Sequence, residues 1–312
     1  MRLAIAALAL LYLATPALAS EGYPALNRST QLGTLSVPQH ELLADLTAQS
    51  VLVLDRASGR TLLEKNATLQ TPIASITKLM TAMLVLDAGQ PLDEWITITQ
   101  ADRDTLKGTG SRLAFGSRYT REQLLHLALI ASDNRAAHAL ARSAPGGLDR
   151  FVDQMNRMAK VLGLAHTRFV EPTGLSSGNQ STAHDLAVLT DHAYRNYPEI
   201  RQISVAGSYA LDNQRVVLRN KKREWVEYRT VAFNNTNRFT RDEGWQVGLS
   251  KTGFINEAGH CLVMQANVAS RDVIIVLLDA QGRNNRAGDA SRIKQWLETG
   301  HFDSRHPPAS RT

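Results

Sequence analysis

The chain has 312 residues and a formal net charge of +6, from 35 Lys and Arg residues against 29 Asp and Glu residues. A chain of this length buries enough surface to fold without disulfides, and its one cysteine, Cys261, excludes an intramolecular disulfide and a cysteine-based metal cage. The mild positive charge favours an anionic polymer or surface as a partner, whereas the lack of basic residues interleaved with aromatic ones argues against nucleic acid.

The first residues have the pattern of a secretory signal peptide. One positive charge, Arg2, precedes an apolar run over 3–13, and the segment ends in the small-x-small pattern Ala17-Leu18-Ala19. The apolar run is shorter than the ~20 residues that span a bilayer, which disfavours the alternative of an uncleaved anchor. We therefore expect a signal peptide over 1–19, cleaved near Ala19, and an exported protein with no stable membrane anchor.

The elements that follow are strands, then helices, then a strand-rich last third. Residues 20–44, with Pro24 and Pro38, predict an extended N-terminal segment. The alternating run over 51–66 predicts a hairpin, and a capping box at Thr120 predicts the start of a helix. Periodicity predicts helices over 75–89, 120–130, 135–142, 148–162 and 182–196, strands over 209–218, 225–233, 246–251, 261–269 and 273–278, and a final helix over 289–297.

This order of elements predicts an α/β fold, in which the strands near the two ends of the chain join one antiparallel sheet with helices on its faces. We expect one catalytic unit over 45–298, with two subregions and a cleft between them, followed by a tail over 299–312. The basic run Arg219-Asn220-Lys221-Lys222-Arg223 is typical of a solvated loop or a hairpin tip.

Three short motifs carry chemistry: Ser75-Ile76-Thr77-Lys78, Ser132-Asp133-Asn134 and Lys251-Thr252-Gly253. In the first, Ser75 and Lys78 share one face of a predicted helix, so the amine can approach the hydroxyl. Burial or a second cation would lower the pKa of the lysine and make it a general base for a serine nucleophile. Taken alone, the motif is also typical of an N-cap serine beside a surface lysine.

The second and third motifs supply other groups that acyl transfer through a serine ester needs. Ser132 can relay a proton to the leaving amine, and Asn134 can hydrogen-bond the substrate amide. Lys251 and Thr252 on a sheet edge make a carboxylate site, and Gly253 lets the substrate backbone approach closely. Singly, these motifs are typical of an interhelix turn and of a strand that ends in a tight turn. Together and in this order, the three motifs predict catalysis.

An oxyanion site is expected beside the third motif. The N–H of Phe254, just beyond the glycine, and the N–H of Ser75 are placed to donate to the developing oxyanion. The nine histidines of the chain show no His-Glu-x-x-His spacing. We therefore expect neither a metal nor another cofactor.

The three ordered motifs resemble those of the serine penicillin-recognising enzymes, which are the penicillin-binding proteins and the serine β-lactamases, over about residues 45–298. The resemblance implies a β-lactamase/transpeptidase-like fold, in which a helical subdomain helps to form the active-site cleft, and it implies covalent inhibition by β-lactam antibiotics. The roles that it implies are those of acyl nucleophile for Ser75, base for Lys78, second-motif pair for Ser132 and Asn134, and carboxylate anchor for Lys251 and Thr252.

Further features are similar to the D-alanyl-D-alanine peptidases within that family (peptidase family S11). The run Glu171-Pro172-Thr173-Gly174-Leu175 has leucine where a class A β-lactamase completes a Glu-x-x-x-Asn pattern. Asn235-Thr236-Asn237 is similar to a segment that these peptidases carry before the third motif. The chain ends about 60 residues after Lys251, without the second β-rich domain and amphipathic anchor of the larger carboxypeptidases. Together with the run over 250–256, this looks like the penicillin-binding protein 7 type, a periplasmic D-alanyl-D-alanine endopeptidase.

The resemblance thus implies hydrolysis of the D-alanyl-diaminopimelate cross-links of peptidoglycan. At such a cross-link a free carboxylate lies next to the scissile amide, so Lys251 and Thr252 can hold a cross-link as readily as a terminal D-alanine. The motifs alone leave three alternatives open: a D-alanyl-D-alanine carboxypeptidase, a serine β-lactamase, and a catalytically silent wall-binding protein.

Overall fold

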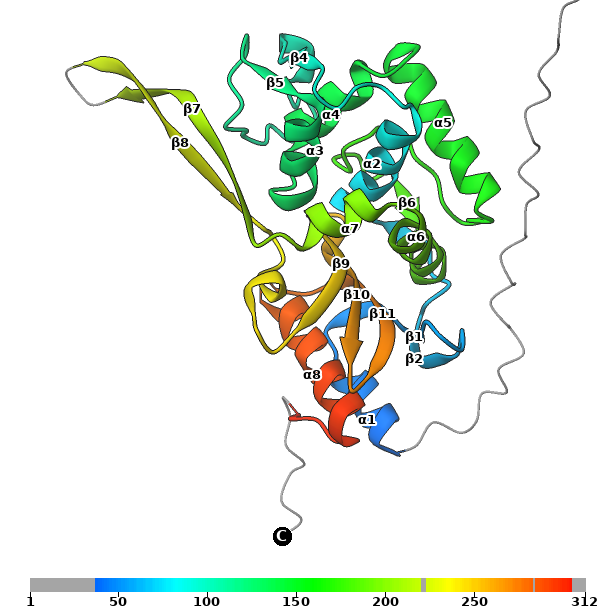
Figure 1. The fold of residues 1–312 in the computed structure, drawn as a ribbon. Coiled ribbons are helices and arrows are strands. Elements are labelled where there is room, and N and C mark those ends of the chain that lie inside the picture. Colours follow the sequence, from blue (N-terminus) through cyan, green and yellow to red (C-terminus); the bar gives the residue numbers. More distant parts are fainter. Residues whose placement is uncertain (1–36, 220–222, 283, 305–312) are drawn as a thin grey trace, which may run out of the picture.

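A computed structural model describes residues 37–219, 223–282 and 284–304 of the chain (Figure 1). The predicted signal peptide over 1–19 and its cleavage near Ala19 lie outside the described residues, as do the centre of the basic run and most of the predicted N-terminal segment and C-terminal tail. The described chain forms a five-stranded sheet with helices on both faces, a group of helices beyond one end of the sheet, and a separate two-stranded ribbon.

The five-stranded sheet is antiparallel and has the strand order β2-β1-β11-β10-β9. Side chains alternate between its two faces: Leu52 and Val276 belong to one hydrophobic cluster, whereas Val51 and Ile275 belong to the other. Because β9 ends the sheet order, the third motif lies on an edge strand. The strands of this sheet are β1 (Ala48–Asp55), β2 (Thr61–Lys65), β9 (Gln246–Ile255), β10 (Gly259–Val268) and β11 (Arg271–Ala280).

Helices cover both faces of this sheet. Helices α1 (Val37–Asp45) and α8 (Asn285–Thr299) pack on one face, where Leu42 and Ile293 join the cluster that contains Val51. Helix α6 (Ala183–Asn196) packs against β1, β10 and β11, and its Leu186 belongs to the cluster on the opposite face. The predicted α/β class, an antiparallel sheet covered by helices, is therefore confirmed.

The remaining helices form a subdomain around α2, in which eight of the ten residues are buried. The predicted capping box is present at the start of α3, where Thr120 Oγ1 accepts a hydrogen bond from Gln123 N at 3.1 Å. The helices of this subdomain are α2 (Lys78–Asp87), α3 (Arg121–Ile130), α4 (Asn134–Arg142), α5 (Gly147–Val161) and α7 (Pro198–Val205). Short elements connect them: β3 (Thr71–Pro72), β6 (Gln180–Ser181), β4 (Trp95–Thr97), β5 (Arg118–Thr120), and the 3-10 helices η1 (Ala74–Thr77), η2 (Gln100–Asp102) and η3 (Arg238–Arg241).

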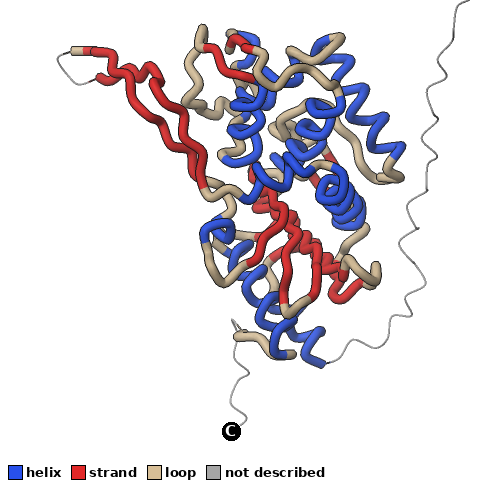
Figure 2. The backbone as a smooth tube through the Cα atoms, in the orientation of Figure 1, coloured by secondary structure: helices blue, strands red, loops and turns tan. Residues whose placement is uncertain are grey.

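Two predicted elements of the last third differ from the structure. Strands β7 (Ser208–Arg219) and β8 (Glu224–Asn234) were expected in the main sheet, but they pair with each other in a sheet of their own. Figure 2 shows them as a long ribbon that projects from the body. The reason is that alternation along a strand specifies an extended backbone but not the partner strand.

The N-terminal segment and the last helix also differ from expectation. Residues 37–44 were predicted to be extended, yet they lie in α1, whose Leu42 is fully buried against the sheet. The prediction of extended backbone from Pro38 was wrong, because proline is also tolerated in the first turn of a helix. Helix α8 begins at Asn285, before the predicted start at Asp289, and α7 was not predicted.

Candidate active site

The first motif lies where a 3-10 helix meets an α-helix. Ser75 belongs to η1, and Lys78 is the first residue of α2. The preceding residue, Ala74, has φ of +47°, a conformation that residues with a side chain rarely adopt. Ser75 Oγ accepts a hydrogen bond from Lys78 Nζ at 2.8 Å. The turn therefore presents the hydroxyl to the cleft while the amine that contacts it is fully buried.

Lys78 is held by two further acceptors. Its Nζ donates to Asn134 Oδ1 at 2.7 Å and to the carbonyl oxygen of Thr173 at 2.6 Å. With Ser75, these acceptors use all three donors of an ammonium group. Burial lowers the pKa of Lys78 to about 8, although the negative charges of Glu171, Asp133 and Asp104 act in the opposite direction. This lowered pKa makes the neutral amine, which can act as a base, more accessible near neutral pH than for an ordinary lysine.

The second motif turns the chain from α3 into α4. Ser132 has φ of +57°, and the next residue, Asp133, caps α4 by accepting from Ala136 N at 2.9 Å. This cap places Asn134 on the first turn of α4 rather than on a loop, with its side chain directed at Lys78. The amide nitrogen of Asn134 donates to Thr109 Oγ1 at 2.9 Å. Both ends of this amide are thus fixed.

The third motif supplies a second buried lysine from the sheet edge. Lys251 Nζ donates to Ser132 Oγ at 2.8 Å and to the Thr252 carbonyl oxygen at 2.9 Å. Burial lowers the pKa of Lys251 well below its ordinary value, and the positive charges of Lys78 and Arg286 lower it further. The side chain of Thr252 donates to Thr236 Oγ1 at 2.7 Å.

Gly253 allows strand β9 to approach the first motif. A Cβ atom at this position would lie 3.0 Å from Ser75 N and 3.0 Å from the Ile73 carbonyl oxygen, so a larger residue would push the strand away. The next residue, Phe254, is 52% exposed and lines the cleft. Because β9 and the first motif lie this close, the backbone segments that carry the two expected oxyanion donors, Ser75 and Phe254, lie next to each other.

A cleft of about 480 Å³ lies between the helical subdomain and β9. Its lining includes members of all three motifs, among them Ser75, Ser132 and Thr252. These groups come from η1, from the α3–α4 turn and from the sheet edge. The arrangement supplies a hydroxyl with a buried amine at hydrogen-bonding distance, which is the requirement for an activated serine.

A comparison with known proteins identifies the family. The sequence profile of the peptidase S11 family, described as D-alanyl-D-alanine carboxypeptidase, matches residues 36–282. The chain belongs to this family. It is 44% identical over 259 residues to the D-alanyl-D-alanine endopeptidase of Pseudomonas aeruginosa, covering 83% of this chain and 80% of that protein. It is 41% identical over 256 residues to the D-alanyl-D-alanine endopeptidase of Escherichia coli, covering 82% of this chain and 79% of that one.

Solved structures of similar proteins agree with this assignment. A mutant of the Streptomyces K15 DD-transpeptidase superimposes with a TM-score of 0.70 at 28% identity and covers 81% of this chain and 98% of its own. Penicillin-binding protein D2 from Listeria monocytogenes, in an ampicillin-bound form, gives a TM-score of 0.65 at 28% identity, with 81% and 97% covered. The predicted resemblance, the penicillin-recognising fold and the hydrolase class of a serine peptidase are confirmed.

The predicted site residues of this S11 peptidase meet in one place, although their catalytic roles stay predictions. Hydrogen bonds join Ser75, Lys78 and Asn134 on one side and Ser132 and Lys251 on the other. The sequence did not predict three partners of the motifs, which are the Thr173 carbonyl, Thr236 and Thr109. Thr173 and Thr236 lie in segments that resemble those of the family, but nothing in these segments shows which motif residue each contacts.

Glu171 occupies a different position from a deacylating base. Its carboxylate accepts hydrogen bonds from Thr173 N at 2.7 Å, from Gly174 N at 2.6 Å and from Asn179 Nδ2 at 2.9 Å. It is not among the residues that line the cleft. The carboxylate organises the loop that carries the Thr173 carbonyl, and this position favours a peptidase of the S11 family over a class A β-lactamase.

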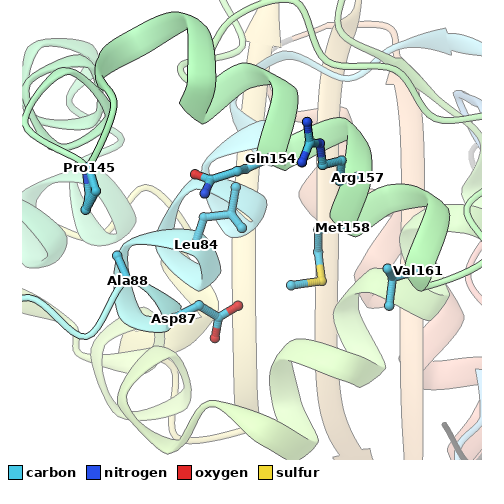
Figure 3. Close-up of a pocket in the computed structure, with 8 residues that line it drawn as sticks. All are labelled: Leu84, Asp87, Ala88, Pro145, Gln154, Arg157, Met158 and Val161. Carbon is cyan, nitrogen blue, oxygen red and sulfur yellow. The ribbon is translucent and has the colours of Figure 1, made fainter. Parts of the chain in front are cut away.

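A second cavity, of about 320 Å³, lies between α2 and α5 (Figure 3). Leu84 and Met158 line it together with Asp87, whose carboxylate accepts a hydrogen bond from Tyr197 Oη at 2.9 Å. None of the residues of the three motifs lines this cavity. The candidate active site of this S11 peptidase is therefore the cleft beside β9.

Proposed function

We propose that this protein is a D-alanyl-D-alanine endopeptidase of the periplasm, which hydrolyses D-alanyl-diaminopimelate cross-links in peptidoglycan through an acyl-enzyme on Ser75. The main support is the contact of a buried amine, Lys78 Nζ, with a hydroxyl that faces the cleft. The endopeptidases of Pseudomonas aeruginosa and Escherichia coli are 44% and 41% identical to this chain, whereas a D-alanyl-D-alanine carboxypeptidase of Bacillus subtilis is 29% identical.

Acylation begins with proton transfer. Neutral Lys78 accepts the proton of the Ser75 hydroxyl, 2.8 Å away, and Oγ attacks the carbonyl carbon of the D-alanine residue. The oxyanion of the tetrahedral intermediate accepts hydrogen bonds from the N–H groups of Ser75 and Phe254. Asn134 accepts a hydrogen bond from Lys78 and also hydrogen-bonds the substrate amide, which keeps the two groups in position.

The leaving amine needs a proton when the C–N bond breaks. Ser132 passes on to the leaving amine the proton that Lys78 took from Ser75, so Lys78 is neutral again, and Lys251, whose Nζ donates to Ser132 Oγ at 2.8 Å, holds this hydroxyl in place. Water then attacks the ester carbon and gives a proton to Lys78, and Ser75 Oγ regains its proton as the ester C–O bond breaks. These steps return the enzyme to its starting state.

The third motif selects substrates with a carboxylate beside the scissile amide. Lys251 and the Thr252 hydroxyl can pair with the carboxylate at the D-centre of diaminopimelate or with that of a terminal D-alanine. β-Lactam antibiotics present a carboxylate near a reactive amide, and they would acylate Ser75 in the same way. The ampicillin-bound form of penicillin-binding protein D2 supports this part of the proposal.

We further propose a catalytic domain over 45–298 and export to the periplasm by the signal peptide over 1–19. Within the described ranges, the helices are all too short or too polar to cross a membrane. Export would bring the basic protein to peptidoglycan, an anionic polymer.

Incubation of the purified protein with cross-linked muropeptide dimers tests the proposal. We expect monomeric products from the wild type and none from Ser75→Ala. Intact-mass measurement after benzylpenicillin treatment should show one adduct that lasts for minutes or longer on the wild type and none on Ser75→Ala. Release of D-alanine without cleavage of dimers would indicate a carboxypeptidase, and rapid turnover of the adduct a β-lactamase. Neither product nor adduct would indicate a silent wall-binding protein.

A further inference from the structure

The cleft extends beyond the third motif into a cationic region. We call this region the arginine arm; Arg238, His260 and Arg286 line it. Neither aspartate nor glutamate is among the described residues that line the cleft. The arm therefore offers positive charge with no carboxylate in its own lining to balance it.

The arm lies on the side of the carboxylate anchor. Thr252 Oγ1 donates to Thr236 Oγ1 at 2.7 Å, which ties the segment before η3 to the third motif. Arg238 follows two residues later as the first residue of η3. Its neighbours Asn237 and Phe239 are both buried, and Asn237 Oδ1 accepts from Phe239 N at 3.1 Å. The backbone of Arg238 is thus fixed in the lining of the cleft that it shares with the third motif.

Arg238 differs from the other arginines near the cleft in having no polar partner among the residues that the structure describes. Arg241, in the same 3-10 helix, donates to the carbonyl oxygens of Gly207 and Asn235 at 2.9 Å each. Arg286 donates to the Cys261 carbonyl oxygen at 3.1 Å. The exposed guanidinium of Arg238 makes no hydrogen bond or ion pair with the described residues, and lies 5.5 Å from the ring centroid of Phe239. All of its donors remain available to a ligand.

The two substrates that the motifs admit differ on this side of the scissile bond. A terminal D-alanine leaves as a small amino acid with one carboxylate, which Lys251 and Thr252 can satisfy. A cross-link leaves as a second stem peptide, which continues past the D-centre of diaminopimelate and carries further carboxylates. A planar guanidinium pairs well with a carboxylate because two N–H groups can donate in parallel.

We propose that Arg238 forms a second carboxylate subsite, which binds the stem peptide on the leaving side of a cross-link and so favours endopeptidase over carboxypeptidase activity. This inference rests on the proposed function. It assigns Arg238 to substrate selection and leaves the chemical step to the three motifs.

Arg238→Gln tests the proposal on the full protein. We expect the ratio of kcat/KM for dimer cleavage to the rate of acylation by benzylpenicillin to fall about 10-fold, with the loss mainly in KM. Benzylpenicillin carries no second stem peptide, so its acylation rate reports whether the variant is folded and active. Arg60→Gln removes an exposed arginine on the β1–β2 turn, outside the cleft lining, and should leave the ratio unchanged.

A chemical variant of the substrate separates a direct contact from a general effect of charge. In an amidated dimer, the carboxylates of the leaving stem other than the one beside the scissile bond are neutral. The wild type should cleave this dimer about 10-fold more slowly, and Arg238→Gln should add no further loss. An equal loss on both dimers, or no loss on either, would overturn the inference alone. Absence of dimer cleavage by the wild type would overturn the proposed function as well.

Discussion

Two buried lysines flank the cleft, and their surroundings carry opposite charge. Lys78, on α2, is close enough to Glu171, Asp133 and Asp104 for their negative charges to oppose the effect of burial, and its pKa falls only to about 8. Lys251, on β9, has positive neighbours instead, and its pKa falls well below the ordinary value. Burial lowers the pKa of both lysines. The sign of the neighbouring charges then decides how far each pKa moves.

This difference suits the two amines to different roles in the proposed mechanism. A pKa of about 8 leaves Lys78 able to take and return a proton near neutral pH, as a general base must. Lys251 has hydroxyl and carbonyl partners at 2.8 and 2.9 Å. A substrate carboxylate beside it would supply the missing negative charge and raise its pKa. Lys251 is therefore suited to bind an anion, and Lys78 to move a proton.

Removal of Lys78 should have the largest effect. We expect Lys78→Ala to lower the second-order rate of acylation by a fluorescent penicillin about 10³-fold, because the proposed general base is lost. Lys160→Ala, which removes an exposed lysine on α5, is the matched control. A loss of less than about 10-fold would show that another group deprotonates Ser75, and the division between the two lysines would fail.

The low pKa of Lys78 also predicts how stability depends on pH. Its pKa is lowered from 10.5 to about 8 in the folded state, so the folded protein binds fewer protons than the unfolded chain between these values. The free-energy cost of burying the charged amine lowers the stability of the folded state. This cost is fully present below pH 8 and disappears as the pH rises toward 10.5. The difference between the two pKa values corresponds to about 3 kcal/mol.

Denaturant unfolding at pH 7 to 10.5 measures this effect. The free energy of unfolding of the wild type, relative to Lys78→Met, should rise with pH across this window. Lys160→Met controls for the loss of one ammonium group. A parallel pH dependence of the wild type and Lys78→Met would mean that the buried amine stays protonated in the folded state.

Local features of the site could be predicted from the sequence, because they depend on neighbouring residues. The spacing of Ser75 and Lys78 is enough to place the amine beside the hydroxyl, and the Thr120 capping box is present as predicted. The contact between Lys251 and Ser132 joins residues 119 positions apart. It depends on how β9 packs against the helical subdomain, and no pattern in the sequence predicted it.

Other features depend on partners that no local pattern specifies. The sequence of β7 and β8 predicts strands, but the choice between joining the main sheet and forming a ribbon depends on the edges that the fold leaves available. The charge environment of Lys78 is a similar case. Glu171 was noted for the pattern around it, and its effect on Lys78 follows from the folding of its loop against α2.

Removal of Lys251 should have a smaller effect than removal of Lys78, and one of a different kind. We expect Lys251→Ala to slow acylation by benzylpenicillin about 10²-fold, through loss of the carboxylate anchor. The methyl ester of benzylpenicillin should react slowly with the wild type and hardly more slowly with the variant. An equal loss for the acid and the ester would show that Lys251 acts on the chemical step and not on the carboxylate.

Replacement of Glu171 should bring the charge environment of Lys78 closer to that of Lys251. Glu171 is the carboxylate that raises the pKa of Lys78 most, so Glu171→Gln should lower that pKa further. A lysine is a base only above its pKa, and the acidic limb of the acylation rate against pH should therefore move to lower pH. Glu298→Gln, which removes an exposed partner of Lys294, should leave the limb in place. If the limb stays where it is while thermal stability falls, Glu171 acts only by holding the Thr173 loop, and the charge of Lys78 is set by burial.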